Sequence, residues 1–298
     1  MVFEIRPARP ADAVGVAQVW AAVMPHLVKS ARAIETELRG GHSRVILLAV
    51  DGPDVVGYSN LYLPEAGAAG ARVRITVQVP PAQRKRGIGS ALLTAISAEA
   101  VTAGAGRLLV AVADDDDSKA FADKRGFALG RRMSHAAADL REAREPVAPP
   151  AGLRLTTYDD LEPRQVFDAE IQVRDDDPSG FSGGPAYDEW VKVSWNNPDI
   201  RRDLSFAVLD GDRVPSFVTT TADPDRGVIW SNLTGTIPSD RGRGLAKVVK
   251  SHALAAARDA GFVTASTGND AGNAPMLAVN QWLGYRTTSG AWTAEKAL

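Results

Sequence analysis

The spacing of apolar residues divides the first half of the chain into alternating strand-like and helix-like segments. Ile88, Leu92 and Ile96 recur at the helical interval, which predicts an amphipathic helix. Runs rich in Val and Ile, bounded by Gly, Pro or Asp-Gly, predict strands. The expected strands are 3–7, 44–50, 54–62, 71–79, 107–112 and 127–138, and the expected helices are 10–23, 28–40, 87–103 and 117–125.

The second half of the chain repeats this order of elements. Its expected strands are 153–157, 205–209, 213–222, 227–236, 262–267, 285–288 and 291–295, and its expected helices are 161–172, 186–195, 242–259 and 272–282. Strands joined by short turns are interrupted by helices in both halves. Each half is therefore predicted to be a mixed, mostly antiparallel sheet with helices on both faces, which is an α+β fold.

A short motif opens the long helix of each half. Both copies follow a strand-like run and a proline, and both precede a glycine–aromatic pair, Gly126-Phe127 or Gly284-Tyr285. The copies are Arg84-Lys85-Arg86-Gly87-Ile88-Gly89-Ser90 and Arg241-Gly242-Arg243-Gly244-Leu245-Ala246-Lys247. A repeat in matched context predicts two copies of one domain. Prolines and small residues at 146–152 predict a linker there, so we expect domains at 1–145 and 153–298.

The motif has the properties of a pyrophosphate-binding turn. Backbone N–H groups in the first turn of a helix lack intrahelical partners, and the helix dipole adds positive charge at the same end. Gly87 and Gly244 allow a ligand to approach the backbone closely, and the neighbouring arginines add full positive charges. The spacing differs from that of an ATP-binding P-loop and from that of a dinucleotide fold.

Composition narrows the class of protein. The chain has 298 residues, of which 45% are apolar, enough for two domains with ordinary cores. The net charge of −2 predicts no nucleic-acid partner and no binding to an anionic membrane. The chain contains no cysteine, and its four histidines lack metal-ligand spacing, so we expect no metal. Neither a signal-peptide pattern nor a long apolar run occurs, which predicts a cytoplasmic protein.

The order strand, proline, Arg-x-x-Gly-x-(Gly/Ala), helix, strand and Gly-Phe/Tyr resembles the GNAT superfamily of acyl-CoA-dependent N-acyltransferases. The two-copy layout resembles tandem members of that superfamily, such as bacterial mycothiol synthase and tandem GNAT proteins of antibiotic pathways. The resemblance implies two tandem GNAT-like domains and acetyl-CoA as the cofactor. It also implies that a bulge splays the fourth strand of each domain from the fifth, leaving a gap for the pantetheine arm.

By this resemblance, each half has a cofactor site. Backbone groups of the fourth strand would position the thioester, and the turn would hold the pyrophosphate. The implied residues are Val77, Gln78, Val79, Arg84, Lys85, Arg86, Gly87, Ile88, Gly89 and Ser90, and then Thr234, Gly235, Thr236, Arg241, Gly242, Arg243, Gly244, Leu245, Ala246 and Lys247. Asn269 and Asn273 match an asparagine-rich variant of the family and could contact the cofactor, or could serve as cap and turn residues.

The chain departs from the family pattern at the proton donor for the departing thiolate. Family members commonly place a tyrosine on the helix before the glycine–aromatic pair, whereas the matching residues here are Ala122 and Asn280. Asn280 can hydrogen-bond a thiolate or thioester, but an amide is a poor proton donor. The first half also carries four aspartates at 114–117, for which we expect a solvated loop and a helix cap.

Acidic residues occur in the second half where the family binds its acceptor, between the first two helices. Asp175, Asp176, Asp177 and Glu189 would attract an amine and could act as its base, or they could form an exposed acidic loop. The matching stretch of the first half, 25–30, is not acidic. The general base therefore stays unassigned.

These observations predict an acetyl-CoA-dependent N-acetyltransferase that acts on a small-molecule amine, with catalysis in the C-terminal domain. Two alternatives stay open. The chain could be an acyltransferase that uses another acyl-CoA or acts from the N-terminal domain. It could also be a non-catalytic acyl-CoA sensor or scaffold, which the missing tyrosines favour.

Overall fold

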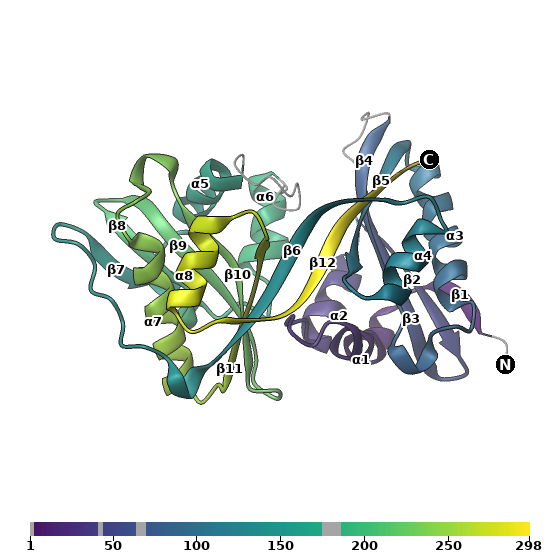
Figure 1. Ribbon diagram of the computed structural model, residues 1–298, viewed down its shortest axis with the longest axis horizontal. Coiled ribbons are helices and arrows are strands. Elements are labelled where there is room, and N and C mark those ends of the chain that lie inside the picture. Colours follow the sequence, from purple (N-terminus) through teal and green to yellow (C-terminus); the bar gives the residue numbers. More distant parts are fainter. Residues whose placement is uncertain (1–2, 41–43, 64–69, 175–185) are drawn as a thin grey trace. The chain divides into compact units, whose positions relative to one another are not determined.

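The computed structural model describes residues 3–40, 44–63, 70–174 and 186–298. They form two compact units (Figure 1). The first unit comprises Met1–Arg132 and Gly290–Leu298, and the second comprises Met133–Ser289. Both units have the α+β architecture that the sequence predicts.

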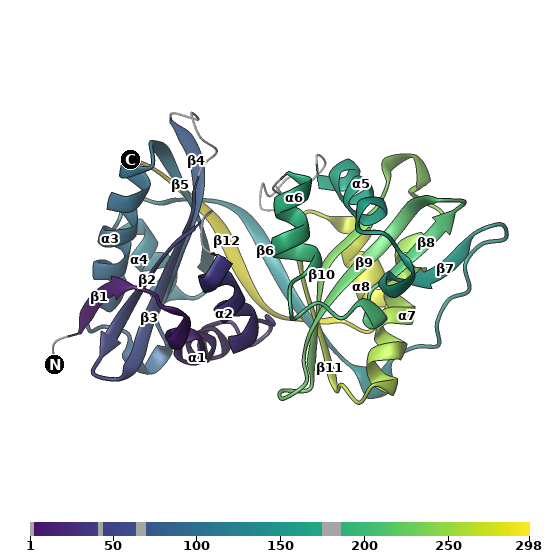
Figure 2. The same cartoon turned by 180° about the vertical axis from the view of Figure 1, so that it is seen from behind.

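The first unit is a sheet with helices on both faces (Figures 1 and 2). Its strands, in spatial order, are β1 (Glu4–Pro7), β2 (Arg44–Asp51), β3 (Asp54–Tyr62), β4 (Ala71–Gln78), β5 (Ala105–Ala113) and the end of β12 (Arg286–Ala297). Neighbours are antiparallel except for the parallel pair β4–β5. Apolar side chains of α1 (Ala13–Val23) and α2 (Ala31–Gly40) cover one face. Those of α3 (Ile88–Thr102) and α4 (Asp116–Asp123) cover the other.

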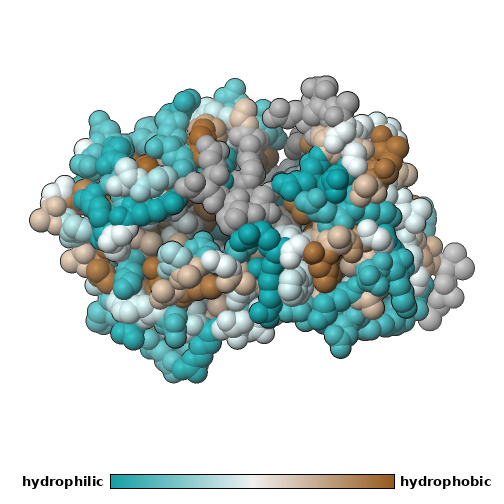
Figure 3. All heavy atoms as spheres, turned by 45° about the horizontal axis from the view of Figure 1, so that its top comes forward, coloured by the Kyte–Doolittle hydropathy of each residue, from teal (hydrophilic) through white to brown (hydrophobic). Residues whose placement is uncertain are grey.

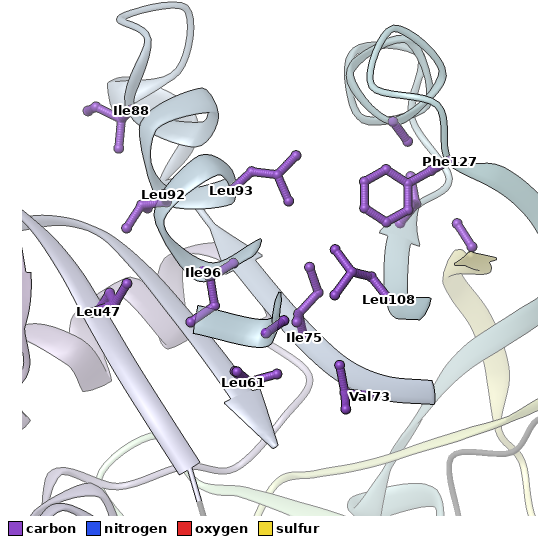
Figure 4. Packing of buried hydrophobic residues seen from close by; sticks show 14 of the residues in the cluster. Leu47, Leu61, Val73, Ile75, Ile88, Leu92, Leu93, Ile96, Leu108 and Phe127 are labelled. Atoms are coloured by element: carbon purple, nitrogen blue, oxygen red, sulfur yellow. The ribbon is translucent and has the colours of Figure 1, made fainter. Parts of the chain in front are cut away.

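Helical periodicity places the apolar stripe of α3 on the sheet. Ile88, Leu92 and Ile96 are each 1% exposed or less and pack on buried strand residues (Figure 4). Leu93 extends from the same helix toward the ring of Phe127. Burying a side chain of this size stabilises the fold by about 1.5–3 kcal/mol.

The second unit has the same plan. Its strands, in spatial order, are the end of β6 (Ala128–Asp139), β11 (Thr264–Asp270), β10 (Val228–Thr236), β9 (Arg213–Asp223), β8 (Phe206–Asp210) and β7 (Arg154–Thr157). Apolar residues of α5 (Pro163–Arg174) and α6 (Tyr187–Trp190) cover one face. Those of α7 (Leu245–Asp259) and α8 (Ala274–Trp282) cover the other.

The last strand of each sequence half completes the sheet of the opposite unit. Met133–Asp139 of β6 pair with β11, and Ala291–Ala297 of β12 pair with β5. The two strands expected at 285–288 and 291–295 are one continuous strand, β12. The predicted halves describe the sequence repeat, whereas the compact units exchange their terminal strands. The apolar pattern of a strand does not specify its partner, because the ladder joins backbone groups that every residue carries.

On the face drawn in Figure 3, hydrophilic side chains surround small hydrophobic patches. Among the residues that the structure describes, no helix is long and apolar enough to cross a membrane.

Candidate active site

The parallel strands at the centre of the second unit separate partway along their length. β10 pairs with β11 from Val228 only as far as Ser231, opposite Thr267. The register of β10 against β9 shifts between Ser231 and Leu233, so Asn232 forms the bulge that the family resemblance implies. Beyond it, within the described part of the sheet, β10 stays paired through Thr236 with β9 only. The separation leaves an edge of β10 available to a ligand, and we call this gap the β10/β11 fork.

The first unit has an equivalent fork without that bulge. β4 pairs with β5 as far as Arg74, opposite Leu109. Ile75–Gln78 pair in the described part of the sheet with β3 only, in unbroken register. The register shift of β4 lies instead at its opposite end, between Ala71 and Arg72. Both units therefore hold open a strand edge that leads toward a helix N-terminus.

The two motif turns share one backbone conformation. Gly87 and Gly244 have φ angles of 86° and 77° and directly precede α3 and α7. Two residues earlier, Lys85 has φ 63° where Gly242 has φ 77°. A Cβ added to either helix-capping glycine would meet no atom within 4 Å, so the space in front of each turn is open. The turns fit the predicted role of binding a pyrophosphate at the N-terminus of a helix.

The arginines of the motif divide into two pairs with different partners. Nε of Arg84 and Arg241 donates to the carbonyl five residues earlier in the chain: Val79 O, just after β4, at 3.3 Å, and Thr236 O, at the end of β10, at 3.2 Å. These contacts fix each guanidinium beside the open strand edge. The same contact in both copies accounts for the position of the first arginine in the motif.

The second arginine of each motif is held in an ion pair. Arg86 pairs with Asp51 at 2.8 Å, and Arg243 pairs with Asp240 at 2.6 Å. Asp240 also accepts a hydrogen bond from Arg213, which is the main cause that lowers its pKa to about 2. Part of the charge of Arg86 and Arg243 is therefore already balanced, and their contact with a cofactor remains a prediction.

The aspartates at 114–117 behave as the sequence predicts for a capped, solvated segment. Asp115 accepts from Ser118 N at 2.8 Å and caps α4. Asp117 pairs with Lys85, and the hydrogen bond from Lys85 lowers the pKa of its carboxyl. Asp114 accepts from Trp292 Nε1 at 3.0 Å. In the turn of the first unit, Lys85 thus holds the carboxylate of Asp117 nearby. The matching residue of the second unit is Gly242, which has no side chain to bind one.

Two of the predicted asparagines lie together beside the β10/β11 fork. Asn280 of α8 is 4% exposed, and its Nδ2 donates to Asn269 Oδ1 of β11 at 2.6 Å. Its Oδ1 has no hydrogen-bond partner among the described residues. Asn273 caps α8 by accepting from Met276 N at 3.2 Å, so it has a structural role whether or not it contacts a cofactor.

The strand residues predicted to face the cofactor differ in their side chains. Val77 and Val79 pack against the apolar core under α3. Gln78 is 3% exposed on the opposite face, with Nε2 2.9 Å from Met24 Sδ. In the second unit the Ser216 hydroxyl donates to Gly235 O at 2.8 Å and lies 2.9 Å from Thr236 Oγ1. Apart from that of Thr234, which is half-buried, these side chains already have contacts within the protein, so the backbone groups are the shared candidates for the predicted contact with pantetheine.

The predicted acceptor side is only partly described. Asp175, Asp176 and Asp177 lie outside the described residues, and Glu189 is a half-buried residue of α6. Sequence reasoning missed Glu170 of α5, a buried carboxylate that accepts from Trp190 Nε1 at 2.9 Å and pairs with Arg174. Burial raises the pKa of Glu170 despite Arg174. Its i, i+4 spacing from Arg174 was the available signal, and it indicates a structural ion pair.

The geometry suits acetyl-CoA in both units. Each unit has an open strand edge, a glycine turn with free space in front of it, and an arginine that donates to a backbone carbonyl near the end of that edge. A bound acetyl-CoA would supply an activated acetyl group as a thioester. The chain contributes backbone donors, positive charge and, in the second unit, the buried Asn269–Asn280 pair.

Known proteins match both the sequence and the fold. The model of the acetyltransferase (GNAT) family matches residues 16–127, from α1 to Phe127. The chain is 31% identical over 217 residues to the mycothiol acetyltransferase of Mycobacteroides abscessus, covering 70% of each. It is 30% identical over 259 residues to the mycothiol acetyltransferase of Thermomonospora curvata, covering 83% of this chain and 80% of that relative.

Solved structures share the two-unit plan. A tandem GNAT protein from the clavulanic acid biosynthesis pathway matches with a TM-score of 0.77, covering 99% of this chain and 98% of that chain. Its sequence identity is 18%, so this likeness shows the fold alone.

Proposed function

Because this chain belongs to the GNAT family of acetyltransferases and is an N-acetyltransferase, we propose that it takes the acetyl group from acetyl-CoA and that its second unit carries the reaction. The acceptor is the amine of a small molecule. The names of its relatives make a mycothiol-related amine the first acceptor to test. The first unit binds acyl-CoA at its own fork and turn.

The observation that carries the choice of unit is the polar pair at the β10/β11 fork. Asn269 and Asn280 bring amide groups to the side of the fork covered by α7 and α8, and the Asn280 oxygen has no hydrogen-bond partner within the described parts of the chain. At the position that matches Asn280, the first unit has Ala122, a buried residue of the apolar core. Acyl transfer develops charge on oxygen and sulfur, and preorganised dipoles stabilise such charge.

A direct test measures thiol release from acetyl-CoA in the presence of a panel of small amines that includes a mycothiol precursor amine. We expect release that depends on both acetyl-CoA and one class of amine. Tight binding of acetyl-CoA by calorimetry without turnover on any amine would instead support a sensor or scaffold.

Asn280→Ala should slow turnover modestly, by less than the roughly 10²–10⁴ that general acid catalysis supplies. The amide stabilises charge by hydrogen bonding and does not deliver a proton, so the variant should gain no requirement for low pH. The measurement is kcat against pH. Gln281→Ala, which changes the neighbouring exposed residue of α8, is the control. A loss beyond about 10⁴-fold with an acid-shifted profile would show instead that residue 280 controls proton transfer.

The acidic residues at the acceptor side are the proposed base. Replacing Asp175, Asp176, Asp177 and Glu189 together by their amides should lower kcat/KM for the best amine by roughly 10²–10⁴ and change its dependence on pH. Asp188→Asn, a charge change at an exposed residue of the same helix, controls for simple electrostatic attraction of the amine. A profile equal to wild type in height and shape would remove these four residues from the mechanism.

A further inference from the structure

The interior beside the fork is polar in the second unit and apolar in the first. Lys250 follows the glycine of its turn by the same number of residues as Leu93, and Tyr285 matches Phe127 after the repeated glycines Gly284 and Gly126. Figure 4 shows Leu93 directed toward Phe127 within the apolar core of the first unit. The first unit therefore shows that leucine and phenylalanine can fill these two positions of the fold. Packing alone does not require the lysine and the tyrosine of the second unit.

Lys250, Tyr285 and Ser231 form a column of contacts that ends at the fork. Lys250 Nζ lies over the ring of Tyr285, 5.0 Å from its centre, and the Tyr285 hydroxyl is 3.3 Å from Ser231 Oγ. Ser231 is the last residue of β10 that pairs with β11. The three residues are between 1% and 5% exposed. The column thus connects the interior of α7 with the point where the strands separate.

Lys250 lies nearer the N-terminus of α7 than the apolar cluster that contains Leu254. Leu254, one turn further along the helix, packs with Ile229 and Ala265. Ser231 lies two residues beyond Ile229 on the same face of the sheet, toward the fork. Lys250 and Ser231 therefore place polar groups beside this cluster on the side of the fork, while Leu245, Val248 and Val249 of α7 belong to a separate apolar cluster.

A lysine in this place is costly for the fold. Its Nζ has no hydrogen-bond partner among the described residues, and burial alone lowers the pKa of Lys250 to about 7. Tyr285 is the titratable group in contact with the amine, and burial raises the pKa of Tyr285 to about 12. Burying an unpaired ammonium is unfavourable, and an apolar side chain of similar volume would be more stable. Residues that cost stability in this way are typical of functional sites.

The tyrosine of the family pattern donates a proton to the departing thiolate, and Asn280, which stands at that position, is a poor proton donor. Tyr285 follows on the same segment, with its backbone N–H donating to Asn280 O at 3.0 Å. Its hydroxyl reaches the end of the β10–β11 ladder from beneath α8. A tyrosine from a different position thus presents a hydroxyl at the fork of the second unit.

We propose that the Tyr285 hydroxyl, oriented by Ser231, and the Lys250 ammonium behind it stabilise the negative charge on the departing sulfur of coenzyme A. This inference rests on the proposal that the second unit carries the reaction. The amine nitrogen bonds to the acetyl carbon as the bond from that carbon to sulfur breaks, and sulfur leaves with the electron pair. The amine loses its proton to its base, and the sulfur later takes a proton from water. Tyr285 is then a catalytic residue and Lys250 a positioning residue that acts through charge.

The first test compares the binding of coenzyme A with that of desulfo-coenzyme A by calorimetry at pH 7, near the pKa of Lys250, so that its ammonium form is present. A site that stabilises the thiolate should favour coenzyme A, and this preference should fall about tenfold in Tyr285→Phe and in Lys250→Leu, the value of one charge-assisted hydrogen bond. Tyr158→Phe is the matched control, because it removes another buried tyrosine hydroxyl, 3.0 Å from Thr219 Oγ1. An unchanged preference in both test variants would overturn the proposal.

The second test measures stability and turnover together. Lys250→Leu should raise the unfolding midpoint while lowering kcat, and a purely structural lysine would give a fall in both. The folded pKa of Lys250 lies below its unfolded value of 10.5, so the unfolded chain holds more protons between about 7 and 10.5. Stability of the wild type should therefore rise with pH across that window, and the gain from Lys250→Leu should be largest below pH 7. A lower midpoint in Lys250→Leu at pH 6.5 would overturn the proposal.

Failure of this inference is distinguishable from failure of the proposed function. If Tyr285→Phe and Lys250→Leu keep full kcat while Gly244→Asp abolishes turnover, the second unit is catalytic and the column plays no part. If Gly244→Asp keeps turnover and Gly87→Asp abolishes it, the reaction takes place in the first unit. The proposed function is then wrong about the catalytic unit, and so is the proposed role of Lys250 and Tyr285.

Discussion

Gly244→Asp should abolish turnover and weaken binding of coenzyme A to the second unit by at least about 100-fold. Residue 244 precedes α7 with φ 77°, and an added Cβ there would point into open space. A carboxylate in that space would repel the pyrophosphate at a helix N-terminus, where an anion is otherwise favoured by the dipole and the free N–H groups. A repulsion of about 3 kcal/mol between two close anions accounts for the expected loss. Calorimetry with coenzyme A and steady-state assays measure the two effects.

Two variants separate charge from strain and one unit from the other. Gly244→Asn introduces a side chain of similar size that tolerates positive φ and carries no charge, so it should lose much less affinity. Gly87→Asp makes the matched change in the first unit, where φ is 86°. We expect it to remove one binding event while most turnover remains. Unchanged affinity for coenzyme A in the double variant Gly87→Asp, Gly244→Asp would refute the cofactor sites altogether.

Removing residues 290–298 should unfold the first unit and spare the second. Ala291–Ala297 form the ladder with β5, Ala294 is fully buried in the core under α3, and Trp292 Nε1 donates to Asp114. Losing a whole strand removes several hydrogen bonds and buried side chains, which is comparable to the roughly 5–15 kcal/mol that holds a domain together. The expected result is loss of amide protection at Leu108 in β5, with protection kept at Ala265 in β11.

Point changes within β12 provide the controls for this deletion. Ala294→Asp places a charge in the apolar core and should reproduce the loss of protection in β5. Glu295→Ala changes the next residue, whose ion pair with Arg72 at 2.9 Å is solvent-exposed, and should cost less than about 1 kcal/mol. Full protection of β5 after the deletion would contradict the exchange of terminal strands.

The sequence determined the features that depend on local interactions. The periodicity of Ile88, Leu92 and Ile96 predicted α3 and the face it buries. Glycine at 87 and 244 predicted turns that open both long helices and admit a ligand close to the backbone, and both glycines are found at positive φ. The bulge in β10 was predicted by family resemblance and is present at Asn232, while β4 runs in unbroken register against β3. The helix and the two turns follow from residues close in sequence, since side-chain period and backbone freedom are local properties, whereas the bulge is a register between two strands that periodicity does not show.

Only the tertiary structure decided which distant groups meet. It paired Arg213 with Asp240 and brought Asn269 to Asn280. It joined β12 to β5, although the repeat alone would keep each terminal strand in its own half. It also placed Lys250 over the ring of Tyr285. In the sequence, Lys250 belongs to a helix and Tyr285 to the turn before a strand, and nothing there links the two residues. Such contacts depend on register, strand order and burial over long sequence separations, and no local pattern of polar and apolar residues encodes them.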